Sequence, residues 1–328
     1  KMGIYGLGVA YLLSGVFQLL MMLPQFFQIM KTYKFVFNLK DPYVKEMFVL
    51  MVPTLIGIFG YQINEIVDNR FATMLPAGTA SALNYASRLY LLPIGVFAIS
   101  LSVVIFPTLS RAVVKNKRKK VRKVVQEGLA MLAFLIVPSS VILFGYAREI
   151  VTLVYKRGHF SNKAVTLTSE TLQFYALGLL FFSTIHLLTR SHYVYKDRKL
   201  PVISSFIGIF TNILLDFLLY KQYRHVGLTF ATSFAAMINF LILFVSLQRR
   251  YVRINVLKYI AILVISLGGS LLSFTISKLV KVSFLGSLSI VVNLLVFLII
   301  YLLIWIAVFM IFADDKFKKD VARRFIKR

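Results

Sequence analysis

The chain has 328 residues, of which 59% are hydrophobic and 15% are charged, and its mean hydropathy is +0.81. A water-soluble domain needs charged residues over its whole surface, so this composition excludes an ordinary soluble fold. The formal net charge is +26, but lysine and arginine fall in short segments between apolar runs, which argues against nucleic-acid binding and is typical of loops facing anionic lipid.

Apolar stretches recur along the whole chain, and each is long enough to cross hydrocarbon about 30 Å thick as a helix. Helices are expected because an isolated apolar segment in lipid must satisfy its own backbone hydrogen bonds. The sequence therefore predicts an all-α fold, a polytopic transmembrane helix bundle of about nine helices. In chain order they cover about residues 3–30, 46–69, 81–109, 127–147, 165–190, 201–220, 226–247, 256–279 and 284–312.

The loops between these stretches set the expected orientation. The most basic loop, 111–123, follows the third stretch, and the segments expected on the same side are also basic. The loops expected on the opposite side are poorer in basic residues, with the exception of the loop after the fourth stretch. The positive-inside rule then places the carboxy terminus in the cytoplasm and the amino terminus outside. An odd number of spans with an external start is natural for a chain whose first helices are missing. The other expected cytoplasmic segments are 31–45, 196–199, 249–258 and 316–328.

Four polar residues stand at comparable depth in the apolar stretches. Asp68 ends the second stretch, while Asn212 and Asp216 lie four residues apart in the sixth and so share one helix face. Thr232 lies about two turns inside the outer end of the seventh. Carboxylate, amide and hydroxyl oxygens suit Na⁺ or a similar cation, so these residues form a candidate cation site.

A structural role for the same residues stays open. Asp68 can simply end its helix in the headgroup region, and Asp216 can pair with Lys221 or Arg224.

Arg88 is a further charged residue at depth, in the outer half of the third stretch among polar and aromatic neighbours. A guanidinium there can hold a phosphate through two parallel hydrogen bonds, and the alternative is snorkelling to the interface. The chain has no cysteine, and its histidines lack metal-ligand spacing. No glycine-rich phosphate loop or HExxH motif occurs, so we expect no enzymatic activity.

Several motifs follow one another between residues 45 and 250. Taken in this order and spacing, they resemble the MurJ (MviN) family of lipid II flippases. They are Gln62-Ile63-Asn64 before Asp68; Tyr85-Ala86-Ser87-Arg88-Leu89 before Leu92-Pro93-Ile94-Gly95 and Phe106-Pro107-Thr108-Leu109-Ser110; Tyr155-Lys156-Arg157-Gly158-His159-Phe160; and Arg190-Ser191-His192-Tyr193 before Asp197-Arg198-Lys199-Leu200-Pro201.

The resemblance implies a fourteen-helix member of the multidrug/oligosaccharidyl-lipid/polysaccharide exporter superfamily, with two six-helix lobes and two extra helices. On that map residues 1–44 are the last helix of the amino-terminal lobe and a cytoplasmic linker. Residues 45–250 are the six-helix carboxy-terminal lobe, and 251–328 are the two additional helices and a basic tail. About five helices of the family are then missing. The resemblance also implies that Arg88 faces the central cavity and that the four oxygen-bearing residues match a sodium site.

The implied function is the flipping of lipid II, an undecaprenyl-pyrophosphate-linked disaccharide pentapeptide, across the bacterial cytoplasmic membrane by alternating access. Membrane potential or a bound cation can reset such a carrier. The expected partners are lipid II, membrane lipids and the missing amino-terminal lobe, and Na⁺ is the candidate cofactor. Two alternatives stay open: a related exporter of another lipid-linked oligosaccharide or a cation-coupled multidrug antiporter, and a non-transporting membrane scaffold for cell-wall synthesis.

Overall fold

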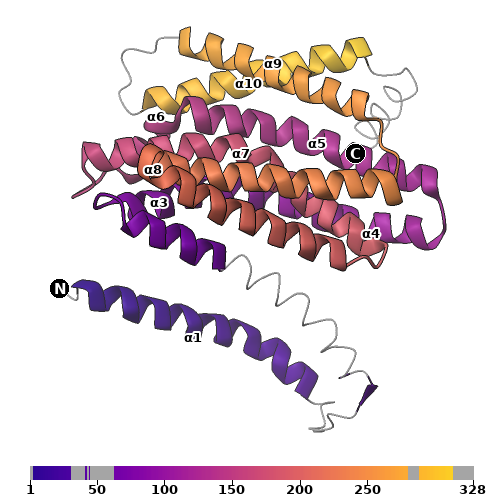
Figure 1. The fold of residues 1–328 in the computed structure, drawn as a ribbon, viewed down its shortest axis with the longest axis horizontal. Helices are drawn as coiled ribbons and strands as arrows, with labels where there is room; N and C mark the ends of the chain where they lie inside the picture. Colours follow the sequence, from indigo (N-terminus) through magenta and orange to yellow (C-terminus); the bar gives the residue numbers. More distant parts are fainter. Residues whose placement is uncertain (1–2, 31–40, 43, 45–62, 280–287, 313–328) are drawn as a thin grey trace. The chain divides into compact units, whose positions relative to one another are not determined.

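A computed structural model of the chain describes residues 3–30, 41–42, 44, 63–279 and 288–312 (Figure 1). The chain divides into two compact units, residues 1–52 and 53–328. All regular elements of the described part are helical, which confirms the predicted all-α fold. Six of these helices are long and apolar enough to cross a membrane.

The first unit contains helix α1 (Gly3–Met30), which coincides with the first predicted stretch. Its 28 residues span about 42 Å, enough to cross the hydrocarbon with some tilt. The predicted basic linker at 31–45 and the basic tail at 316–328 lie largely or wholly outside the described residues. Of the second predicted stretch, 46–69, the described part begins at residue 63 and stays helical to residue 73.

The third predicted stretch is one continuous rod made of α3 (Thr79–Pro93), the π-helical segment η1 (Ile94–Ile99) and α4 (Ser100–Val114). Pro93 ends α3, and the wider π-helical turn follows directly. Proline has no N–H to donate and its ring crowds the preceding turn, so a local change of helical pitch at this point has a direct steric cause.

Two predictions for the next region are wrong in detail. The basic segment 111–123 was expected to be a loop, but α5 (Arg118–Gly145) already begins at Arg118. Lysine and arginine are good helix formers with long apolar stems, so the helix continues beyond the hydrocarbon. The segment after it, also expected to be a loop, contains the short helix α6 (Ala147–Tyr155), which buries Ala147 and Val151.

Helix α7 (Asn162–Val194) is the centre of the second unit. Its start is capped by Ser161, whose Oγ accepts a hydrogen bond from the Ala164 N–H at 3.2 Å. It packs against α3, α4, α5, α6, η1 and α8 (Lys199–Arg250). Leu172, Leu179, Leu187 and Leu188 are fully buried along it, so this apolar helix forms the core around which the others assemble.

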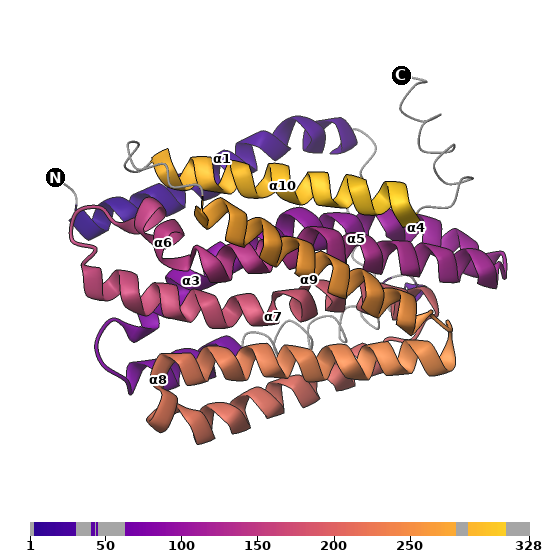
Figure 2. The same ribbon diagram turned by 90° about the horizontal axis from the view of Figure 1, so that it is seen from above.

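Helix α8 is a hairpin of two arms. Its 52 residues would extend about 78 Å if straight, far more than the hydrocarbon thickness. The backbone reverses at Arg224, with φ 52° and ψ −133°, and Figure 2 shows the two arms running side by side. A Cβ on Gly227 would lie 2.9 Å from the Leu219 carbonyl oxygen, so the tight turn requires glycine there. The reversal falls between the sixth and seventh predicted stretches.

Helices α9 (Val256–Leu279) and α10 (Leu288–Phe312) pack on each other, and α9 packs on α5. The small buried residues of α9 let its backbone lie close to the neighbouring helices α5 and α10. The Tyr301 hydroxyl on α10 donates to the Phe134 carbonyl at 2.9 Å, while Lys278 pairs with Glu149 at 2.6 Å. The small buried residues of α9 are Ser266, Gly269, Ser270, Ser273 and Ser277.

Candidate functional site

The α8 hairpin brings the predicted polar residues of its two arms to one level. Asp216 precedes the reversal at Arg224 by eight residues, and Thr232 follows it by eight. In antiparallel helices each therefore lies about 12 Å from the turn. Asn212 lies one turn further along the same face as Asp216. The hairpin geometry thus explains why residues 20 apart in sequence meet, as Asn212 and Thr232 do.

The helical segment 63–73 brings Asp68 to the same place. The Thr232 hydroxyl lies 3.4 Å from Asp68 Oδ2 and donates to it. In the amide orientation that matches donors with acceptors, Asn212 Nδ2 donates to Asp68 Oδ1 at 3.0 Å and to Asn64 Oδ1 at 2.5 Å. The Asn212 oxygen then accepts from the Thr232 backbone N–H at 3.1 Å. The structure therefore joins three helical segments through one polar cluster.

The cluster holds two buried carboxyl groups. Asp68 is 8% exposed and Asp216 is fully buried, and the two are close enough to hydrogen-bond to each other. Two carboxylates in such contact repel unless a proton or a cation lies between them. Asp216 Oδ1 has no hydrogen-bond partner in the described part of the chain, and the pairing of Asp216 with Lys221 or Arg224 is not among the ion pairs found there.

These donors are all oxygens. Carboxylate, amide and hydroxyl oxygens are ligands of hard cations, whereas transition metals favour imidazole and thiolate. No group of three or more His, Cys, Asp or Glu side chains in the described residues is placed to hold a metal ion. The orphaned oxygen of Asp216 and the net negative charge of the pair therefore fit a monovalent cation such as Na⁺ better than a transition metal.

Arg88 lies on an exposed face of α3. One turn earlier on α3, Asn84 Nδ2 lies 3.4 Å from Asn69 Oδ1, and Asn69 directly follows Asp68. Arg88 thus projects from a helix that touches the segment carrying Asp68. The side chain has no carboxylate partner in the described residues, so its guanidinium is available to an anion.

Three aromatic residues support the helix surface beside Arg88. The rings of Tyr85 and Tyr155 lie 4.9 Å apart, and that of Phe160 lies 5.5 Å from Tyr85. The Tyr155 hydroxyl donates to the Tyr85 carbonyl at 3.1 Å. Tyr155 also lies within electrostatic reach of Arg88. The Tyr155–Phe160 motif therefore fixes the connection between α6 and α7 against the part of α3 that carries Arg88.

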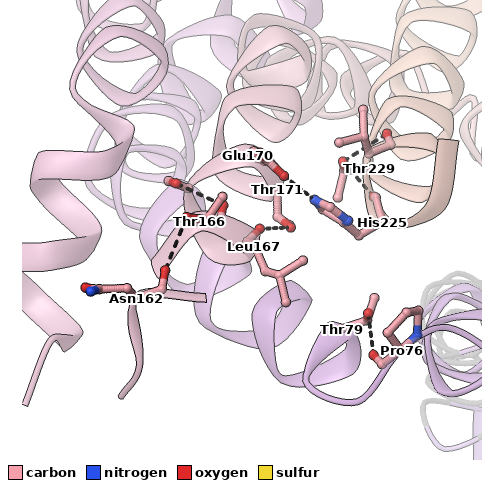
Figure 3. Close-up of polar contacts among 11 residues, drawn as sticks. Pro76, Thr79, Asn162, Thr166, Leu167, Glu170, Thr171, His225 and Thr229 are labelled. Atoms are coloured by element: carbon pink, nitrogen blue, oxygen red, sulfur yellow. Dashed lines mark hydrogen bonds and ion pairs between the residues drawn. The ribbon is translucent and has the colours of Figure 1, made fainter. Parts of the chain in front are cut away.

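A second polar contact lies beside the α8 reversal and was not predicted. His225 Nε2 lies 2.9 Å from Glu170 Oε2 on α7, and Figure 3 shows the two side chains pointing toward each other. His225 is 7% exposed and immediately follows Arg224. This contact attaches the start of the second α8 arm to the central helix, which is a structural role.

The chain matches known proteins over most of its length. A family model described as "Lipid II flippase MurJ" matches residues 1–311. The chain belongs to the MurJ family. The resemblance predicted from the motifs is confirmed. A probable lipid II flippase MurJ of Vibrio cholerae is 33% identical over 239 residues, which are 73% of this chain and 46% of the relative. The lipid II flippase MurJ of Burkholderia cenocepacia is 28% identical over 254 residues, covering 76% and 49%.

Solved structures agree with the family. The inward closed conformation of a lipid II flippase MurJ matches with a TM-score of 0.71 and 29% identity, over 87% of this chain and 59% of that one. A MOP-superfamily transporter from Pyrococcus furiosus matches with a TM-score of 0.55 and 17% identity, over 70% and 52%, which shows the fold alone. The chain spans about half the length of the curated MurJ relatives it matches. It is a multi-pass membrane protein of this family.

The structure brings Asp68, Asn212, Asp216 and Thr232 together, but cation binding stays a prediction. Sequence reasoning missed the part of Asn64, although it lies one turn before Asp68 in the polar stripe and faces the same way.

Proposed function

We propose that the intact protein moves lipid II from the inner to the outer leaflet of the bacterial cytoplasmic membrane by alternating access. The observation that carries the proposal is the match of residues 1–311 to the MurJ family. The partners would be lipid II and the surrounding membrane lipids. No bond in the substrate needs to break in such a transfer, because the carrier binds one molecule and changes its exposure.

Arg88 would hold the pyrophosphate of the substrate. It lies exposed on α3 without a carboxylate partner in the described residues, and a guanidinium matches phosphate oxygens through two parallel hydrogen bonds. The neighbouring ring of Tyr155 would limit the orientations of the guanidinium. The polyprenyl chain of the substrate would remain in lipid, since nothing compensates for removing so much apolar surface from the membrane.

The test is Arg88→Ala in cells that depend on this protein for lipid II transport. Loss of one charge-assisted interaction of about 1.5–3 kcal/mol weakens phosphate binding roughly tenfold to a hundredfold, so we expect failure to support growth at normal expression. Arg122→Ala is the matched control, because Arg122 is exposed on α5 and outside the site. Normal growth with Arg88→Ala removes this residue from the mechanism. Transport of another lipid-linked saccharide, with no rescue of lipid II flipping, identifies a related exporter instead.

We also propose that the carboxylate cluster binds Na⁺. Asp68 and Asp216 would supply charge, and Asn212 and Thr232 would supply neutral oxygens. A cation there would offset the repulsion between the carboxylates and hold the segment 63–73 against the α8 hairpin. Binding would thereby favour the arrangement in which these helices are in contact, which couples an ion gradient to the transport cycle.

The orientation proposed from charge places the carboxy terminus in the cytoplasm. Basic residues gather at the α4–α5 turn and after α8, which is the pattern of cytoplasmic loops. A reporter enzyme that is active only in the cytoplasm, fused after residue 328, should be active. An inactive cytoplasmic reporter together with an active external one reverses the proposed orientation.

A further inference from the structure

A cavity lies beside the turn that joins α4 to α5, next to the ends of α7 and α8. Its volume is about 210 Å³, below the roughly 300–1,000 Å³ of sites for drug-sized ligands. It is therefore suited to a small group and not to a whole saccharide. It is separate from Arg88 and from the carboxylate cluster. Its lining residues are Ala112, Val113, Asn116, Arg118, Val121, Tyr195, Arg250 and Tyr251.

The ends of α4 and α7 lie at the cavity and have the same backbone turn. At the end of α4, Asn116 has φ 50°, the Asn116 N–H donates to the Val113 carbonyl at 2.9 Å and the Lys117 N–H donates to the Ala112 carbonyl at 2.9 Å. This is a Schellman turn, for which asparagine is well suited. The end of α7 repeats it, with φ 60° at Lys196. Backbone hydrogen bonds thus hold the rim of the cavity in a fixed shape.

Of the described residues that line the cavity, two are arginines and none carries a carboxylate. The ion pairs of the described residues are Lys123–Glu127, His225–Glu170 and Lys278–Glu149. In that part of the chain, neither Arg118 nor Arg250 is paired with a carboxylate. Both are exposed enough to turn toward a ligand. Two unpaired guanidinium groups at the wall of one small cavity favour an anion with several oxygens.

One acid, Asp197, bonds to the lining residue Tyr251, and its single negative charge offsets only one of the two arginine charges. Asp197 accepts from the Tyr251 hydroxyl at 3.0 Å and from the Leu200 N–H at 3.2 Å, so both its oxygens are engaged. Burial, followed by this contact with Asp197, raises the pKa of Tyr251, which keeps the phenol neutral. The rings of Tyr195 and Tyr251 stack with centroids 4.3 Å apart, so one side of the cavity is rigid.

Helix α5 adds a further positive contribution. It begins at Arg118, and no side chain caps its first N–H groups. The Arg118 and Lys120 N–H groups already donate to the Asn116 and Lys117 carbonyls, so what favours an anion at this end is the helix dipole.

We propose that this cavity binds a phosphate group between Arg118 and Arg250. The phosphate could belong to the headgroup of an anionic phospholipid or be free inorganic phosphate, since both offer the same oxygens. The basic segments around the cavity place it on the expected cytoplasmic face, where anionic lipid is abundant. The site stands independently of lipid II transport, because it uses none of the residues assigned to that function.

The test compares two double variants of the intact protein in detergent. Arg118→Gln with Arg250→Gln removes the two cavity charges, and Arg122→Gln with Arg249→Gln removes two exposed charges beside the cavity. Thermal unfolding is followed while phosphatidylglycerol, phosphatidylcholine or inorganic phosphate is added at constant ionic strength. We expect a phosphate source to raise the melting temperature of the wild type and of the Arg122/Arg249 variant. The Arg118/Arg250 variant should need at least about tenfold more of it for the same shift.

The possible outcomes distinguish a lipid headgroup from free phosphate and show whether the cavity binds either. A shift with phosphatidylglycerol but not with inorganic phosphate assigns a lipid headgroup, and an arginine-dependent shift with phosphate alone assigns the free anion. Equal responses of the two double variants mean attraction to surface charge and overturn the proposal, as does the absence of any shift with either phosphate source. If the Arg118/Arg250 variant does not fold, the single variants Arg118→Gln and Arg250→Gln give the same comparison with Arg122→Gln and Arg249→Gln.

Discussion

Replacing Asp216 with asparagine should abolish sodium binding while preserving the fold. Asp216 is fully buried and lies against Asp68, and asparagine has nearly the same shape with one charge fewer. Unit charges about 4 Å apart interact by about 4 kcal/mol at an effective dielectric constant of about 20. Part of this is offset because Asp68 loses its like-charged neighbour. We therefore expect sodium affinity to fall at least about a hundredfold, which corresponds to about 2.7 kcal/mol.

The assay is the sodium dependence of thermal stability of the intact protein, with choline as the reference cation. At a sodium concentration about 100 times the wild-type Kd, binding stabilises the protein by about 2.7 kcal/mol. After a hundredfold loss of affinity, the same concentration contributes about 0.4 kcal/mol. Without sodium, Asp216→Asn should be at least as stable as the wild type, because two buried carboxyl groups no longer face each other.

The matched control is Glu170→Gln, which also removes one carboxylate near the α8 reversal but lies outside the cluster. It should retain the full sodium response. The reasoning is refuted if the wild type shows no response specific to sodium, or if Asp216→Asn responds as strongly as the wild type.

Two further predictions concern packing. Gly178→Ala should destabilise the protein by about 1–3 kcal/mol in denaturation experiments, because the added Cβ would lie 2.8 Å from Ser233 Cα on α8. The control is Gly268→Ala on α9, which should be neutral or stabilising because nothing lies within 4 Å of the added Cβ. Equal destabilisation by the two substitutions would contradict the close approach of α7 and α8. Tyr155→Phe removes the hydrogen bond to the Tyr85 carbonyl and should lower the free energy of unfolding by about 0.5–1.5 kcal/mol. Tyr155→Ala also removes the ring contacts with Tyr85 and Phe160, so it should lower both stability and transport. Unchanged transport in Tyr155→Ala would mean that the aromatic group does not position Arg88.

Much of the helical architecture could be predicted from apolar runs alone. In lipid each span must satisfy its own backbone hydrogen bonds, so a long apolar run is sufficient evidence for a helix. The same reasoning placed the α8 reversal between residues 220 and 226, and the structure has it at Arg224. It failed for α6 and for the first turns of α5 because hydropathy reports the preferred solvent of a segment, and basic residues form helices well in water.

The sequence predicted the comparable membrane depth of the candidate site residues, but it could not predict which of their side chains are in contact. Residue spacing and alternating helix direction placed Asp68, Asn212 and Thr232 at comparable depth. The sequence could not show that Asn64 joins them or that Arg88 lies beside Tyr155. Helical periodicity gives the face that residues share, but the rotation of each helix about its axis is set by its packing partners.

By itself, then, the sequence determined a membrane bundle, the approximate ends of its spans and the family, because these follow from local composition and from short motifs in a fixed order. Tertiary structure alone decided which polar residues touch. The meeting of Asp68 with Asp216 depends on a third segment packing against a closed hairpin. The cavity between Arg118 and Arg250 depends on four helix ends meeting, a relation between residues far apart in sequence that no local pattern encodes.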